Sequence, residues 1–136
     1  MRYFALCFSL IFILFAYWQI NDPDPIWWIT VYLIPAYISL RVFGNKYSYE
    51  VLIILSVLYS AHAINSFLQI INYEGFFTEG EGLSMKTSNQ ELAREAAGLC
   101  ICVLTFIIYS IYFFIKEKKR VPDEIYSTVK LNTDKL

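Results

Sequence analysis

Charge, glycine, proline and histidine are all scarce in this chain of 136 residues. Charged residues make up 17% of the sequence, whereas soluble domains average about 25%. A single histidine excludes the zinc motifs that pair two histidines, and no phosphate-binding loop, nucleophile elbow or dinucleotide fingerprint is present. Lysine and arginine form no basic face interleaved with aromatic residues. We therefore expect no nucleic-acid partner, and the case for an enzyme is weakened.

Cysteine is also rare, with Cys7, Cys100 and Cys102 all inside apolar runs. An odd count without a C-x-x-C pair argues against a disulfide framework, and buried cysteine behaves as a small hydrophobic residue. On a helix, Cys100 and Cys102 would point about 200° apart. We assign these residues no redox role, and we expect no cofactor.

Apolar residues, in contrast, are abundant: 57% of the chain is hydrophobic and 18% is aromatic. They form four continuous runs of about 18 residues or more, each long enough to cross ~30 Å of hydrocarbon. Because the runs are continuous rather than alternating, helices are predicted instead of strands. The prediction is an all-α integral membrane protein with a four-helix transmembrane domain (1–115) and a cytoplasmic polar tail (116–136). The predicted spans are 3–20, 26–43, 49–71 and 92–115.

The basic residues beside these runs predict the orientation. The count is seven on one side and two on the other. The larger group is Arg2, Arg41, Lys46, Lys116, Lys118, Lys119 and Arg120, and the smaller is Lys86 and Arg94. Both termini are therefore predicted in the cytoplasm, in a multi-pass protein of the plasma (cytoplasmic) membrane.

The second predicted span carries three local signals. Asp24 precedes a proline at the expected first helical position, so we expect its carboxylate to cap the helix by accepting backbone N–H groups. Pro35 lies mid-span, where it frees the carbonyl of Val31 and favours a kink. Gly44 and Asn45 then end the helix, because both residue types tolerate positive φ.

Polar and ionisable side chains gather at the outer end of the predicted bundle. Such residues are costly inside a membrane, so each is a candidate functional residue. Helical spacing places Tyr59, His62, Asn65, Ser66 and Gln69 on one face of the third span, and Glu91, Arg94, Glu95 and Gly98 on one face of the fourth. Gly98 would let a neighbouring helix approach closely. The candidate cluster is Asn21, Asp22, Asp24, His62, Asn65, Gln69, Glu91, Arg94 and Glu95.

Several roles are consistent with this cluster. His62 and Glu95 could form a proton-transfer pair, although depth alone favours Asn65 as the partner of Glu95. The carboxylates with His62 could hold a divalent metal, but no ligand spacing supports this and we assign no metal ligand. Arg94 could bind an anionic headgroup. The interpretation that we favour slightly is a structural polar lock between helices.

Three elements of the chain resemble the transmembrane protein 220 family. They are Gln19-x-Asn21-Asp22-Pro23-Asp24-Pro25-x-x-Trp28-x-x-x-Tyr32-x-x-Pro35, the third-span His62, and Arg94-Glu95-x-x-Gly98-Leu99. The resemblance covers residues 19 to about 99, and its most specific part is Asn-Asp-Pro-Asp. It implies a small multi-span membrane protein without an established activity. It implies no catalytic residues.

The function predicted from these observations is a non-enzymatic accessory or ligand-binding membrane component with an outward-facing polar site. The alternatives are an integral membrane enzyme acting on a lipid or small molecule at the outer leaflet, and an oligomeric transporter subunit. The expected partners are the lipid bilayer and either a membrane protein or further copies of the chain.

Overall fold

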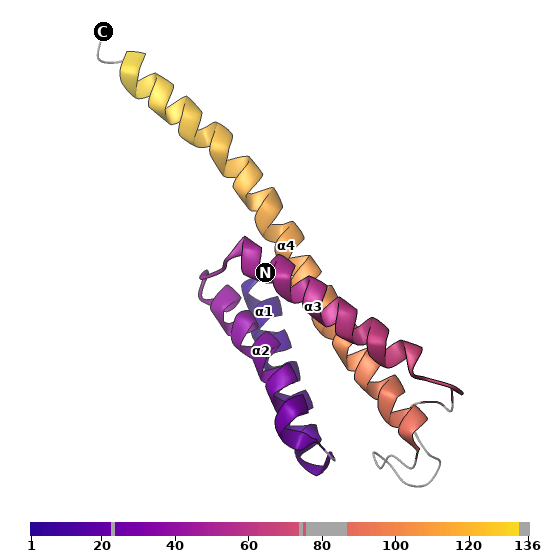
Figure 1. Cartoon of the computed structure of the whole chain (residues 1–136). Coiled ribbons are helices and arrows are strands. Elements are labelled where there is room, and N and C mark those ends of the chain that lie inside the picture. The colour runs from indigo at the N-terminus through magenta and orange to yellow at the C-terminus, as the bar shows by residue number, and fades with distance from the viewer. Residues whose placement is uncertain (23, 74, 76–86, 134–136) are drawn as a thin grey trace.

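The computed structural model describes residues 1–22, 24–73, 75 and 87–133, and side chains up to residue 118 except that of Asn21. Over these residues the secondary structure is helical (Figure 1). The α-helices are α1 (Arg2–Trp18), α2 (Pro25–Phe43), α3 (Tyr49–Leu68) and α4 (Ser88–Thr133), and a 3₁₀ turn, η1 (Gln19–Asn21), joins α1 to α2. The predicted all-α class is confirmed.

The helices form two hairpins, α1 with α2 and α3 with α4, and α2 contacts α4 between them (Figure 1). At one end Arg2 donates to the carbonyl of Phe43, and Tyr47 donates to Glu117. We call this the basic end, after Arg2, Arg41 and Lys46. The opposite end holds Asp22, Asp24, Glu91 and Glu95 and is called the acidic end. The residues that begin α1 and those near 117 in α4 therefore share one end of the bundle.

Among the described residues, three helices are long and apolar enough to cross a membrane: α2, α3 and residues 88–118 of α4. Helix α1 is apolar but has only 17 residues, or about 25 Å at 1.5 Å per residue. The predicted third span ended at residue 71, whereas α3 ends at Leu68. Helix α4 begins at Ser88, and its backbone stays helical through Thr133, so the polar tail starts as a continuation of the same helix.

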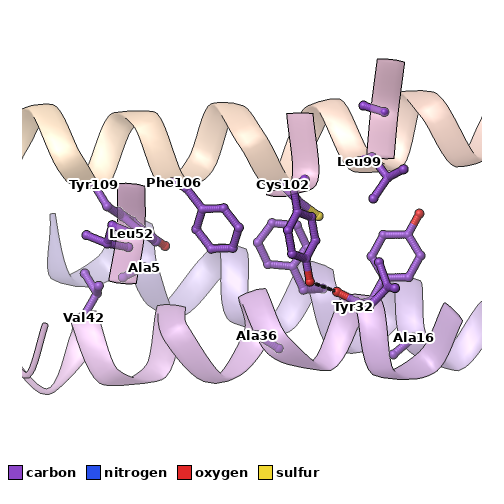
Figure 2. Close-up of a cluster of buried hydrophobic side chains, with 14 of the residues drawn as sticks. Ala5, Ala16, Tyr32, Ala36, Val42, Leu52, Leu99, Cys102, Phe106 and Tyr109 are labelled. Atoms are coloured by element: carbon purple, nitrogen blue, oxygen red, sulfur yellow. Dashed lines mark hydrogen bonds between the residues drawn. The ribbon is translucent and has the colours of Figure 1, made fainter. Parts of the chain in front are cut away.

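The core forms where α4 lies against the first hairpin. Leu99, Cys102, Phe106 and Tyr109 recur every three or four residues on α4 and are buried (Figure 2). Cys102 is buried and Cys100 is exposed, as expected for residues on opposite sides of a helix. Small buried residues on α1, namely Ala5, Ser9 and Ala16, allow α1 and α2 to pack closely.

Hydrogen bonds from hydroxyl groups connect the helices inside the core. The Ser9 hydroxyl donates to the Ala36 carbonyl at 3.1 Å and holds α1 against α2. The Tyr109 hydroxyl donates to the Ser39 hydroxyl at 2.9 Å and joins α4 to α2. Both bonds are buried, so water could not take the place of either partner if a bond were lost.

A third bond resolves the backbone defect at Pro35. Helix α2 continues through this proline, which has no N–H to offer the Val31 carbonyl. The expected free carbonyl is confirmed, and the Tyr59 hydroxyl of α3 donates to it at 2.6 Å. Tyr59 thus joins the second hairpin to the first at the site of the defect.

The loop between α1 and α2 differs from the prediction. Asp24 does occupy the N-cap position, but its side chain makes no capping hydrogen bond. Instead, the Asp24 N–H donates to Oδ1 of Asp22 at 3.1 Å, so Asp22 is the carboxylate that orders the loop. This is an Asx-turn, in which the side chain bonds the backbone two residues on. At the other end of α2, Asn45 has φ +57°, as expected for the helix terminus.

The bond between Tyr59 and Val31 can be tested with a double-mutant cycle. We expect Tyr59→Phe to lower the free energy of unfolding in mixed micelles by about 1 kcal/mol, because the Val31 carbonyl loses its donor. Pro35→Ala restores an N–H four residues after Val31, so Tyr59→Phe should cost less in that background. An equal cost in both backgrounds would contradict the assignment. Tyr3→Phe, at a position that is 87% exposed, is the control.

Candidate functional site

The candidate site lies at the acidic end, where the loop before α2 meets the first turns of α4. Asp22 is 9% exposed and holds the loop through its bond to the Asp24 backbone. Asp24 is exposed. On α4, Glu91 interacts electrostatically with both aspartates, and so does Glu95. The structure thus brings together four of the predicted carboxylates, from segments about 70 residues apart in the sequence.

Arg94 is the basic member of the predicted cluster, and it also lies in this region. It interacts electrostatically with Tyr32 of α2, as Glu95 does. Tyr32 is 3% exposed and lies within the core, one turn below Trp28. Arg94 therefore lies near the α2–α4 contact and forms part of the same charged region as the carboxylates.

His62 projects from α3 toward two tryptophans of α2. Its ring lies 5.6 Å from that of Trp28 and 6.2 Å from that of Trp27, measured between centroids. The Trp27 contact is edge-to-face, at an interplanar angle of 78°. The Nε2 atom of His62 is buried, and it has no hydrogen-bond partner among the residues that the structure describes. The side chain therefore acts as a packing element between α3 and α2.

Of Trp28 and His62, it is Trp28 that interacts with Glu95. The indole N–H is the only donor of the Trp28 side chain, and it lies near the Glu95 carboxylate and interacts with it. The same indole contacts His62 on α3, so one buried side chain of α2 connects residues of α3 and α4. No hydrogen bond joins Glu95 to the buried Nε2 of His62. The pair required for the proton-transfer hypothesis is not formed.

Gly98 provides the space that the sequence predicted. A Cβ at this position would overlap the hydroxyl of Tyr32, and the ring carbon that bears the hydroxyl would lie only 3.0 Å away. Gly98 is buried, and no larger residue fits without displacing Tyr32. The close approach of a neighbouring helix at Gly98 is confirmed, and the neighbour is α2.

Two predicted members, Asn65 and Gln69, lie apart from this group. Asn65 and Gln69 are exposed on α3, where the Gln69 amide donates to the Asn65 carbonyl, and the side chain of Asn21 lies outside the described residues. Asn65 lies about 100° around the helix from buried Ser66, which is why the two do not share a face. Asn65 is exposed, and the structure shows no hydrogen bond between it and Glu95. Trp27 and Trp28 contact this group, but the sequence analysis did not assign them to the candidate cluster.

An open hollow lies beside the cluster on the surface of α2. Its volume is about 480 Å³, and it is lined by Asp24, Pro25, Ile26, Trp27 and Thr30. We call it the Trp27 hollow. Trp27 is 58% exposed, so the ring is accessible from outside while its edge contacts His62. Within the described part of the chain, no three histidine, cysteine or acidic side chains are placed to share a metal ion.

The contact at Gly98 gives a test of how the two hairpins fit together. We expect Gly98→Ala to lower the free energy of unfolding by about 1–3 kcal/mol, since the new methyl group overlaps the Tyr32 hydroxyl. Adding Tyr32→Phe should recover part of that loss. Gly44→Ala is the matched control, because a Cβ there meets nothing closer than 3.5 Å. Equal costs for the two alanine variants, measured by unfolding in micelles, would refute the contact.

Comparison with known proteins identifies the family. The family model described as transmembrane family 220, helix, matches residues 11–111. The match includes α2, α3 and the first part of α4, together with both sides of the acidic end. No curated protein and no solved structure matches the chain. Because the model covers well over half of the sequence, this chain belongs to transmembrane family 220.

Proposed function

We propose that this protein is a non-enzymatic membrane component that binds an ammonium-bearing ligand at its acidic end. The observation that carries the proposal is the Trp27 hollow, where an exposed indole and an exposed carboxylate line one open depression. A cation above an indole ring gains about 0.5–2 kcal/mol from the ring quadrupole, and a nearby carboxylate adds charge attraction.

The surrounding charges favour the same ligand class. Asp22, Glu91 and Glu95 interact electrostatically with one another or with Asp24 at this end of the bundle. Grouped carboxylates raise the local concentration of cations. Trimethylammonium or primary ammonium groups carry this charge in free choline-like solutes and also in zwitterionic phospholipid headgroups, so both sources supply suitable chemistry.

The buried residues behind the hollow give the binding surface a fixed shape. His62 contacts the edge of the Trp27 ring, and Trp28 is held between His62 and Glu95. An aromatic side chain that is already oriented loses little entropy when a ligand binds. In this proposal the predicted polar lock and the predicted ligand site are neighbouring parts of one arrangement.

The catalytic alternative has less support from the same geometry. General acid–base chemistry needs a donor and an acceptor within hydrogen-bond reach of each other or of one substrate. Glu95 interacts with Trp28 and His62 is packed against two indoles, so both side chains already have contacts within the bundle. Binding without turnover is therefore the function that we propose.

For the topology we propose four membrane crossings with the basic end in the cytoplasm. Helix α1 lies along α2, with Arg2 beside Phe43 at one end and Phe15 against Tyr32 nearer the other. The pairing supports a first crossing even though α1 has only 17 residues. The excess of lysine and arginine at the basic end supports its cytoplasmic location.

The topology can be tested with reporter fusions. Alkaline phosphatase joined after Ile115 should be inactive, because the enzyme requires export from the cytoplasm to fold. The same reporter inserted within residues 79–84 should be active. The opposite pattern of activities would reverse the proposed orientation.

Ligand binding can be tested by saturation-transfer NMR on the full chain in a maltoside detergent. Choline should bind more tightly than dimethylbutanol, its neutral carbon isostere. We expect Trp27→Ala and Asp24→Asn each to weaken choline binding by about five- to tenfold, the loss of one cation–π contact or one charge interaction. Trp18→Ala removes a tryptophan outside the hollow and should change the affinity less than about twofold.

Lipid nanodiscs distinguish the two sources of the ammonium group. Phosphatidylcholine nanodiscs should suppress the choline signal if the site takes a lipid headgroup, whereas phosphatidylglycerol nanodiscs should leave it intact. If neither kind of nanodisc suppresses the choline signal, the ligand is a free solute. Equal affinity for dimethylbutanol, or no effect of Asp24→Asn, would overturn the proposed function.

A further inference from the structure

A second cavity lies at the basic end, beside the turn that joins α2 to α3. Its volume is about 70 Å³, which is room for a few water molecules or one group of phosphate size. Cationic, hydroxyl-bearing and apolar side chains all contribute to its wall. Among them are Arg41, Lys46, Tyr47, Ser48, Ile38 and Val51.

The two cations of this cavity have no acidic partner in the part of the chain whose side chains are described. Arg41 lies over the Tyr37 ring at 5.9 Å from its centroid, and donates one weak hydrogen bond to the Tyr37 hydroxyl. Among the described residues, neither Arg41 nor Lys46 forms an ion pair. The nearest acidic residue in sequence, Glu50, accepts a bond from the Ser48 hydroxyl at 2.7 Å. A second carboxylate, Glu117, accepts a bond from the Tyr47 hydroxyl. Neither glutamate lines the cavity, whereas both cations do, so the cavity wall favours an anion.

The backbone of the turn holds Arg41 and Lys46 next to each other. The Lys46 N–H donates to the Arg41 carbonyl at 2.8 Å, which brings the two residues together across the end of α2. The Gly44 N–H donates to Leu40, and Asn45 adopts φ +57° to make the reversal. The backbone positions of the two residues are thus fixed, so that only their side chains have to be ordered when an anion binds.

The surroundings of the cavity are suited to a lipid. Leu40 is 45% exposed and Val51 is 41% exposed, so apolar surface borders the charged groups. A free anion would gain nothing from such a surface, whereas acyl chains would bury it. We propose that the cavity binds the phosphate group of an anionic phospholipid, with its acyl chains against α2 and α3. The proposal is independent of the ligand at the acidic end.

The side chains of Arg41 and Lys46 would contact the phosphate group in different ways. The guanidinium of Arg41 has a planar set of donors that matches two phosphate oxygens, and the Lys46 ammonium adds a compact charge. Anionic lipids are concentrated in the cytoplasmic leaflet, which is where the proposed topology places this end. The lipid would therefore lie beside the loop that connects the two hairpins.

Native mass spectrometry of the full chain in a maltoside detergent tests this site. The probes are phosphatidylglycerol and phosphatidylcholine with identical acyl chains. We expect tighter retention of phosphatidylglycerol, and an Arg41→Gln/Lys46→Gln variant should bind it at least about tenfold more weakly, as expected when charge-assisted hydrogen bonds are lost. Val51→Phe should also weaken retention, because it fills the cavity without changing any charge.

The matched control removes the same charge at the same end of the bundle. Lys116→Gln/Lys118→Gln alters two exposed lysines of α4 that do not line the cavity, and should change binding less than about twofold. Similar losses in the two double variants would show diffuse attraction and overturn the site. Equal retention of both lipids, or displacement of the lipid by millimolar inorganic phosphate, would overturn the lipid assignment.

Discussion

Backbone carbonyls and hydroxyl groups buried in the core of this bundle need partners within the protein, because hydrocarbon offers none. The carbonyl that Pro35 leaves without its helical N–H is the clearest case, and a hydroxyl from another helix meets this requirement. The same constraint accounts for the serine of α1 that bonds α2, and for the tyrosine of α4 that bonds Ser39. Hydrophobic packing alone discriminates poorly among helices in lipid, so these directional bonds specify which faces meet.

The two ends of the bundle use polar residues in different ways. At the acidic end, charged groups from two distant segments converge around buried aromatic rings, and one indole contacts a residue on each of two other helices. At the basic end, the charges are exposed beside a small cavity and a sharply folded turn. The first arrangement fastens helices together, whereas the second leaves charge available to molecules outside the protein.

The helices themselves were predictable from the sequence, because continuous apolar runs have few alternatives in a membrane. The free carbonyl of Val31 and the special backbone of Asn45 were also predictable, since both follow from the chemistry of single residues. Which group would bond Val31 was not. Tyr59 is 28 residues away, and its role depends on how the two hairpins are rotated against each other.

The candidate site was predicted less well for the same reason. Residue type and depth correctly grouped the carboxylates, but they did not reveal that Trp28 would be the partner of Glu95. The sequence predicted that the Asp24 carboxylate would accept backbone N–H groups, and only the loop geometry assigns a backbone bond to Asp22 instead. Asn65 was misplaced because a difference of one residue turns a side chain by about 100°.

The division into two sequence-local hairpins has a consequence for biogenesis. Helices that pair with their immediate neighbours can associate as soon as both have left the ribosome, so the first hairpin is complete before α4 is synthesised. Docking of the second hairpin then forms the Tyr59 and Tyr109 bonds together with the contacts around Trp28. The acidic end therefore takes shape only in the last step of assembly. In a chain truncated before Glu91, this end would lack two of its four carboxylates.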